Sequence, residues 1–339
     1  MSKRKLTRRQ QWRIDKIQGE RRERADRKAA AVVSGDLGAE QNGLVVVHHG
    51  QQVTVEDAEG TLHRCHFRSN LDQLVVGDRV VWQPQKDGGI GVISALIPRD
   101  SVLKRPDPYG NLKPVAANID LLAIVFSPLP APSSDLLDRY LVAAELSGIT
   151  PLLVLNKADL LDDTLRPWLD ELSALYQPLG YRVIEASATS LHGLDTLREA
   201  LVGHTSAMVG QSGVGKSSLV NVLLPEVEQQ IGPLSERSGL GQHTTVAAKL
   251  FHLPGGGSLI DSPGIREFGL WHISEEQLLS GYRELAELAG HCKFRNCSHR
   301  HEPGCALHAA AEAGEISEER LDNFLRIADS LDEEGRKRY

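Results

Sequence analysis

A phosphate-binding loop is the first feature of this sequence that could do chemistry. Residues 210–217 read Gly-Gln-Ser-Gly-Val-Gly-Lys-Ser and fit the pattern G-x-x-x-x-G-K-[ST] in full, between an apolar stretch and a helix-compatible one. Glycines let backbone N–H groups turn toward phosphates, and the following helix N-terminus adds a favourable partial charge. The pattern predicts that the lysine contacts the terminal phosphates and that the final serine hydroxyl ligates Mg²⁺. The predicted phosphate-binding residues are Gly210, Gln211, Ser212, Gly213, Val214, Gly215, Lys216, Ser217 and Ser218.

A guanine-recognition tetrad, Asn-Lys-Ala-Asp at 156–159, follows an apolar stretch further up the chain. Its aspartate carboxylate can accept both the N1–H and the N2 amino proton of guanine, a donor pair that adenine lacks, so GTP is predicted rather than ATP. The lysine stem is expected to cover the base, and the asparagine to tie its loop to the phosphate loop. A Ser-Ala pair is expected to support the base through a backbone N–H. These residues are Asn156, Lys157, Asp159, Ser187 and Ala188.

The order of the two motifs is unusual. An ordinary GTPase domain runs from the phosphate loop through the switches to the base-recognition loop, whereas here residues 156–159 precede residues 210–217. The domain is therefore predicted to be circularly permuted. The alternative is a P-loop kinase or ATPase that contains the tetrad without using it to read the base.

Switch-like segments follow the phosphate loop. Asp261 ends the apolar run 258–260 and begins the sequence Asp-Ser-Pro-Gly. A carboxylate at the end of a strand suits an indirect Mg²⁺ contact, and Gly264 offers an N–H to the terminal phosphate. The sequence Gly-Gln-His-Thr-Thr at 241–245 lies between the phosphate loop and Asp261. GTPases carry a switch threonine in this region, which closes on Mg²⁺ and the γ-phosphate. Thr245 is the first candidate for this threonine and Thr244 the second.

Ile265 stands where many GTPases carry a glutamine that orients the attacking water. An aliphatic side chain cannot orient water, so another group must do so, or intrinsic hydrolysis is slow. His243, beside the switch threonines, is the candidate catalytic residue. The alternative is a histidine that faces solvent in a loop.

Three of the four cysteines share a fourteen-residue segment with a histidine. The spacing C-x4-C-x-H-x5-C offers three thiolates and one imidazole, a donor set typical of a closed tetrahedral zinc site. Because the protein fills all four positions, the zinc is predicted to be structural; iron is the alternative metal. His291, His301 and His308 are alternatives to the histidine ligand. The predicted ligands are Cys292, Cys297, His299 and Cys305.

The N-terminal part of the chain contains short runs of residues typical of β-strands. Five of them lie in residues 43–93, separated by Gly, Asn and Asp turns, which predicts a small barrel of the oligonucleotide-binding (OB) type. A barrel with no nucleic-acid role is the alternative. Cys65, within the third run, is expected to be a buried apolar residue.

From residue 121 onward, apolar strand-like runs alternate with helical segments, as in a doubly wound parallel sheet. Residues 274–339 are mostly helical in pattern, with helix starts at Ser274 and Ser317. The predicted fold class is therefore multidomain α/β. Its parts are a disordered basic arm (1–34), an OB-like β-barrel (35–98), a proline-rich linker (99–118), a circularly permuted P-loop GTPase domain (119–272) and a C-terminal helical zinc-binding domain (273–339).

Charge is distributed unevenly along the chain. Residues 1–28 hold twelve Lys and Arg against four Asp and Glu, a net charge of +8, so the remainder carries −15 of a total of −7. A basic arm on an acidic body predicts a polyanionic partner such as RNA, and a solubilising tail is the alternative. Lys293, Arg295 and Arg300, within the Cys/His segment, are also expected to meet phosphates.

Composition limits the class of protein. An apolar fraction of 41% and a charged fraction of 24% are typical of a soluble globular protein. The sequence contains no run of about 18 apolar residues that would suit a transmembrane helix. The charged N-terminus lacks the apolar core of a secretory signal. We expect a cytoplasmic monomer without a membrane partner.

Together these motifs resemble the small-ribosomal-subunit-dependent GTPase A family, also called RsgA or YjeQ. The resemblance covers nearly the whole chain: the OB-like part, N-K-A-D ahead of G-Q-S-G-V-G-K-S-S, G-Q-H-T-T, D-S-P-G and the Cys/His spacing. It implies GTP hydrolysis stimulated by the small ribosomal subunit during late maturation, as a checkpoint near the decoding centre, with GTP state controlling rRNA binding and release. The family's proposed catalytic histidine maps onto His243. An RNA-binding assembly factor with a non-catalytic nucleotide site is the alternative.

Overall fold

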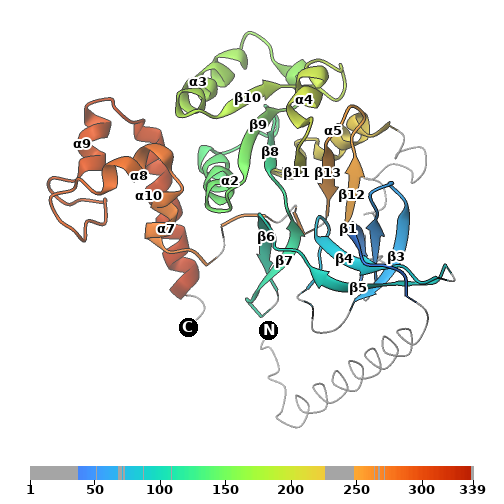
Figure 1. Cartoon of the computed structure of the whole chain (residues 1–339). Coiled ribbons are helices and arrows are strands. Elements are labelled where there is room, and N and C mark those ends of the chain that lie inside the picture. Colours follow the sequence, from blue (N-terminus) through green and yellow to red (C-terminus); the bar gives the residue numbers. More distant parts are fainter. Residues whose placement is uncertain are drawn as a thin grey trace, which may run out of the picture. The chain divides into compact units, whose positions relative to one another are not determined.

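The structure, a computed structural model, describes two compact units, one of residues 37–99 with 248–249 and one of residues 100–225 with 250–336 (Figure 1). The predicted basic arm lies outside the described residues, as does 226–247, the segment with the predicted switch threonines and His243. The remaining residues outside the description are 51, 68–70, 72, 87, 108, 263, 266–267, 271 and 337–339, with only the backbone described for 332–336.

The first unit is a closed barrel of five strands. β1 pairs with β2 and β4, β3 pairs with β2 and β5, and β4 pairs with β5, so the circuit of neighbours closes. Closure leaves no free sheet edge, and the predicted five-stranded barrel is confirmed. The strands are β1 (Gln41–His49), β2 (Gln52–Glu56), β3 (Leu62–Phe67), β4 (Arg79–Gln83) and β5 (Gly91–Leu96).

Alternating side chains fill the barrel. In β2, Val53 and Val55 are fully buried, while their neighbours are only partly so, the period of two expected of a strand with one buried face. Trp82 of β4 is the largest side chain of this core. Cys65 lies in the same core, as predicted, and burial raises the pKa of its thiol to about 12.

Residues 102–117, predicted as part of a linker, instead form an antiparallel hairpin of β6 (Val102–Pro106) and β7 (Leu112–Ala117). The prolines suggested broken structure, but each strand of a two-stranded hairpin has one unpaired side, where a missing N–H is tolerated. Asp107 closes the turn, since its carboxylate accepts the backbone N–H groups of Tyr109 and Asn111. Leu103 of β6 is fully buried.

A mainly parallel sheet forms the centre of the second unit, in the strand order β10-β9-β8-β11-β13-β12. β8 runs parallel to both β9 and β11, and its six residues are all buried, as expected for a central strand. The predicted doubly wound sheet is confirmed. The strands are β8 (Leu121–Phe126), β9 (Thr150–Leu155), β10 (Arg182–Glu185), β11 (Thr205–Val209), β12 (Lys249–His252) and β13 (Ser258–Asp261).

Helices cover both faces of this sheet. α4 and α5 pack against alternate side chains of β8, among them Ala123 and Val125. On the opposite face Phe126 meets Trp168 of α3 edge to face, with ring centroids 6.3 Å apart. The helices here are α2 (Ser134–Leu146), α3 (Arg166–Tyr176), α4 (Leu194–Leu201) and α5 (Lys216–Leu223), with the short 3-10 helices η1 (Ala158–Leu160) and η2 (Gln177–Leu179).

Among the described residues after the sheet, the α-helices are α7 (Glu275–Ser280), α8 (Arg283–Ala289), α9 (Ala306–Glu312) and α10 (Glu318–Arg336). Ser274 caps α7 as predicted, because its hydroxyl accepts the N–H of Gln277 while the Gln277 side chain accepts the N–H of Ser274. No helix within the described residues is long and apolar enough to cross a membrane.

Candidate functional site

The predicted phosphate loop joins β11 to the N-terminus of α5. Lys216 folds back over the loop, and its ammonium donates to the carbonyls of Gly210 and Gln211, both at 2.7 Å. Gly215, the N-cap of α5, has a φ of +90°, a conformation that glycine adopts without strain. A Cβ at this position would lie 2.3 Å from the Asn156 amide nitrogen, so only glycine fits the junction.

Asn156 joins three segments that are distant in the sequence. Its side chain is 1% exposed, and its amide donates to the Val214 carbonyl at 2.8 Å. Its amide oxygen accepts the backbone N–H of Ala188 at 3.3 Å. The predicted tie between the base-recognition loop and the phosphate loop is therefore present in the structure.

Lys157 adopts a left-handed backbone conformation with a φ of +60°, uncommon for a residue with a side chain. Its ammonium donates to the carbonyls of Gly213 and Leu129, both at 2.7 Å. The lysine stem thus bridges from the base-recognition loop to the phosphate loop. Strained backbone of this kind is common at ligand sites.

Asp159 is exposed in η1, and the buried Ser187 donates its hydroxyl to one carboxylate oxygen. The same hydroxyl accepts the backbone N–H groups of Thr189 and Ser190, which fixes its position. A carboxylate oriented by a buried hydroxyl can present its remaining acceptor sites to a pair of N–H donors.

Three of the predicted phosphate and Mg²⁺ residues converge at one edge of the sheet. β11 and β13 are parallel neighbours, so the phosphate loop and Asp261 follow the carboxyl ends of adjacent strands. Lys216, Ser217 and Asp261 line one small hollow at this edge. A hydroxyl and a carboxylate oxygen are donors that Mg²⁺ prefers, so these residues fit the ion.

Gly264 is buried, and its N–H donates to the Ser262 hydroxyl at 3.2 Å. A Cβ on Gly264 would lie 3.0 Å from Val115 of β7, so the β6–β7 hairpin covers this glycine. The Ile265 side chain is 1% exposed and faces the protein interior. It therefore neither orients nor contacts water, as the sequence predicted.

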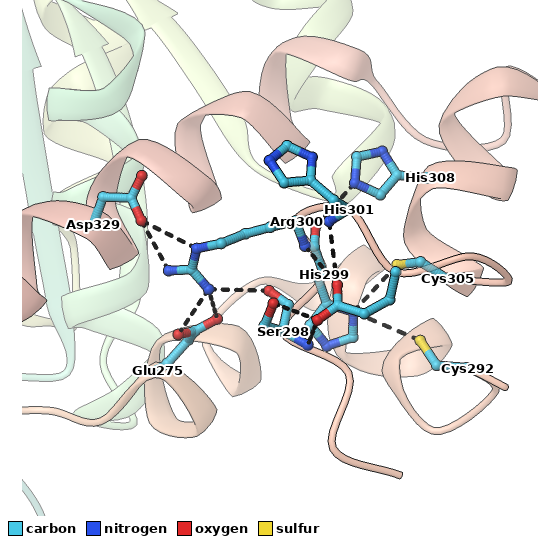
Figure 2. A network of polar contacts seen from close by, with 10 residues as sticks. Glu275, Cys292, Ser298, His299, Arg300, His301, Cys305, His308 and Asp329 are labelled. Atoms are coloured by element: carbon cyan, nitrogen blue, oxygen red, sulfur yellow. Dashed lines mark hydrogen bonds and ion pairs between the residues drawn. The ribbon is translucent and has the colours of Figure 1, made fainter. Parts of the chain in front are cut away.

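The four predicted zinc ligands meet in space, with all four donor atoms within 4.8 Å of one another. The His299 Nδ1 lies 3.6 Å from the Cys292 sulfur and 3.4 Å from the Cys305 sulfur (Figure 2). Tetrahedral zinc bonds of ordinary length separate such donor atoms by roughly 3.5–3.8 Å, so the cluster fits the ion. His291, His301 and His308 are not part of this cluster.

The surroundings of the cluster favour metal binding. Burial lowers the pKa of His299, which keeps the imidazole in its neutral, ligating form. The N–H of Ala306, at the start of α9, points at the Cys292 sulfur at 3.3 Å and would stabilise a thiolate. The Nε2 of His308 lies 2.9 Å from the His299 carbonyl, holding the ligand loop.

Comparisons with known proteins agree with this arrangement. A family model described as RsgA GTPase matches residues 96–271. The chain belongs to the RsgA GTPase family.

Curated relatives of this RsgA-family chain match it from end to end. A protein of Alcanivorax borkumensis, named small ribosomal subunit biogenesis GTPase RsgA, is 65% identical and covers 100% of this chain and 99% of the relative. A protein of the same name from Pseudomonas fluorescens is 55% identical, covering 98% and 99%.

Two solved structures share the fold. YjeQ from Thermotoga maritima is 34% identical with a TM-score of 0.72, covering 86% of this chain and 99% of that one. YloQ, described as a circularly permuted GTPase, is 26% identical with a TM-score of 0.70, covering 87% and 96%.

One prediction is not supported for the Cys/His segment of this RsgA-family chain, residues 292–305, which is called the zinc segment below. Arg300 was expected to meet phosphates, but its guanidinium binds Glu275 at 3.0 Å and Asp329 at 2.8 Å and points away from the sulfur atoms (Figure 2). It therefore joins the zinc segment to α7 and α10. Glu302 braces the same loop by accepting the N–H and hydroxyl of Ser298, and these hydrogen bonds lower its pKa to about 2.

Sequence reasoning missed residues 127–130, which lie against the candidate nucleotide site of this RsgA-family chain. Leu129 contributes a carbonyl to Lys157, and Pro130 lies beside Gly213. The segment carries no motif. Its position at the carboxyl end of β8, next to β11, was the available signal, because ligands bind at that edge of a parallel sheet.

Proposed function

We propose that this protein is a GTP hydrolase that binds the small ribosomal subunit through rRNA and acts in its late maturation. Its GTP state would control binding and release. The observation that carries the proposal is the end-to-end similarity to relatives named small ribosomal subunit biogenesis GTPase, joined to a permuted nucleotide site whose parts converge. The proposal places the protein in the cytoplasm, acting as a monomer.

Base recognition is assigned to the loop after β9. Asp159 would accept the guanine N1–H and N2–H groups while Ser187 holds its other acceptor site. Lys157 would cover the base with its stem. Ala188 would give up its hydrogen bond to the Asn156 amide oxygen and donate its backbone N–H to the base. Asn156 keeps this loop in register with the phosphate loop, which fixes the distance from base to phosphates.

Phosphate binding is assigned to the loop before α5. On GTP binding, the Lys216 ammonium would exchange its two carbonyl partners for β- and γ-phosphate oxygens. Ser217 and Asp261 would hold Mg²⁺, together with Thr245 or Thr244. A bound Mg²⁺ neutralises charge that develops on the phosphates. Gly264 would give up its hydrogen bond to Ser262 and donate its N–H to the γ-phosphate.

We expect His243→Ala to lower kcat by roughly 10²–10⁴-fold, the usual contribution of a proton-transfer or water-orienting group. GTP affinity should stay within about twofold, because the histidine would act only on the attacking water. The buried Ile265 supports the assignment, since it leaves that task to another residue. Single-turnover rates and nucleotide titration distinguish the two effects. Loss of binding equal to the loss of rate would contradict a catalytic role.

RNA binding is assigned to the basic arm, the barrel and the zinc segment. In the zinc segment, Lys293 and Arg295 flank the exposed Phe294, whose ring lies 5.5 Å from the Lys293 ammonium. Exposed aromatic rings between cations suit stacked bases beside phosphates. Zinc held by the four ligands would keep this loop folded, so its role there is structural.

A second candidate function is an RNA-binding assembly factor whose nucleotide site does not turn over. The aliphatic Ile265 in the water-orienting position is the observation that favours it. Multiple turnover of GTP by purified protein would exclude this candidate.

The central test is GTP turnover by the purified protein, alone, with isolated small ribosomal subunits and with large subunits as a control. We expect turnover to rise with the small subunit and not with the large one, because binding to the correct RNA surface would hold the switch residues in the arrangement that hydrolyses GTP. Equal rates in all three reactions would contradict the proposed partner while leaving a GTPase.

A further inference from the structure

A buried arginine joins the C-terminal helices to the GTPase sheet. Arg320 of α10 is fully buried, and its guanidinium pairs with Asp138 of α2, which is also fully buried. The other side of the guanidinium binds Glu284 of α8 through Nε at 2.7 Å and Nη2 at 3.2 Å. Fully buried charges persist in proteins only when such partners satisfy them.

Asp138 is the acceptor at the centre of this network. Its carboxylate accepts the Tyr176 hydroxyl of α3 at 2.8 Å and the Asn323 amide of α10 at 2.8 Å, in addition to Arg320. The ring of Tyr282 lies under the guanidinium at 4.4 Å, a cation–π contact. Arg320 and Asp138 therefore each have partners on both sides of the junction between α2 and α10.

Further contacts along α2 also hold it against the C-terminal helices. At its start, Ser134 donates to the Asn323 amide oxygen at 3.1 Å. One turn further on, Arg139 donates to Ser330 of α10 at 2.6 Å. A Cβ on Gly281 would lie only 2.5 Å from Val142, so the α7 backbone packs directly on the same helix. The C-terminal helices are thus attached along the length of α2.

The chain just before α2 forms part of the nucleotide site. The carbonyl of Leu129 accepts the Lys157 ammonium at 2.7 Å and the buried Ser127 hydroxyl at 3.0 Å. Four residues, 130–133, separate that carbonyl from the first residue of α2, and two of them are prolines with a fixed φ. A shift of α2 would therefore move the carbonyl that holds Lys157.

We propose that Arg320 is a positioning residue for guanine-nucleotide binding, acting through Asp138, α2 and the Leu129 carbonyl on Lys157. The inference rests on the proposed GTP-binding function. Its consequence is that the C-terminal helices influence the base side of the site and not only the switch-like motif, residues 261–264, that precedes them in the chain. RNA bound at the zinc segment would then alter how tightly the protein holds its nucleotide.

The experiment measures dissociation of a fluorescent GDP analogue, and KM and kcat for GTP, in the full chain. Arg320→Lys keeps the charge but loses the planar guanidinium that bridges Asp138 and Glu284. We expect nucleotide to dissociate about five- to twentyfold faster, a modest coupling between distant sites, with KM raised and kcat and zinc content unchanged. Arg166→Lys, in an exposed pair with Glu185, is the matched control and should leave all values unchanged.

A double-mutant cycle separates positioning from general destabilisation. If Arg320 acts through Lys157, the effects of Arg320→Lys and Lys157→Ala on nucleotide dissociation will be clearly less than additive. Additive effects, or wild-type dissociation in folded Arg320→Lys protein, would overturn the proposal. If Arg320→Lys does not fold, Asn323→Ala tests the proposal in the same assay. This variant removes the hydrogen bonds that Asn323 makes with Asp138 and Ser134. Failure of the wild-type protein to bind the analogue would instead count against the proposed function.

Discussion

Asp159→Asn is expected to lower GTP affinity by roughly 10²–10⁴-fold, because two hydrogen bonds to a charged acceptor are worth about 1.5–3 kcal/mol each. The asparagine amide would meet the guanine N2 amino group donor to donor. Xanthine carries a carbonyl there, so the variant should prefer xanthosine nucleotides. Competition titrations with GTP, ATP and XTP measure the change.

The control for this prediction is Asp163→Asn, the same chemical change at an exposed position four residues further on. It should leave GTP affinity and base preference unchanged. A loss of GTP affinity in Asp159→Asn without a gain for XTP would show that the carboxylate supports the loop, through Ser187, rather than reading the base.

Removal of zinc is expected to unfold the segment 291–305, since structural zinc sites contribute an apparent free energy of about 10–16 kcal/mol. α10 should stay attached, because Arg320 and its partners hold it to α2 independently of the metal. Chelation should therefore expose three thiols to a labelling reagent while Cys65, buried in the barrel, stays protected. Acid should release the metal as well, because the thiolates must be protonated to leave it.

Two variants test the zinc prediction. Cys305→Ser removes a buried ligand and should reduce bound zinc from one equivalent to a small fraction. Cys65→Ala removes a buried thiol outside the cluster and should retain the full equivalent. Zinc retained by Cys305→Ser, or thiols that stay protected after chelation, would contradict a structural site at these residues.

The chemistry of the nucleotide site could be read from the sequence because its motifs are local. The phosphate loop needs glycines, a lysine and a serine at fixed spacing, and the base loop needs one aspartate after a buried strand. The Cys/His cluster could be predicted for the same reason, since its four residues lie within fourteen residues of sequence. The OB-like barrel followed from strand alternation, although its closure depends on the β1–β4 pairing, which no local pattern reveals.

The hairpin at 102–117 and the carbonyl of Leu129 lay beyond sequence reasoning for different reasons. Proline counts alone predicted a linker, and only pairing between the two strands makes the hairpin. A backbone carbonyl has no sequence signature, because every residue has one. Its role depends on where β8, β9 and β11 end relative to one another.

By itself, the sequence determined which chemistry the chain carries motifs for: GTP binding, with the motifs in permuted order, and a Cys/His cluster that could hold a metal ion. Only the tertiary structure decided how those sites are connected. Asp138 and Arg320 are 182 residues apart, and each alone reads as an ordinary charged residue on a helix surface. Their pairing follows from the packing of α10 on α2, since a buried charge is stable only where the fold brings its partner to it.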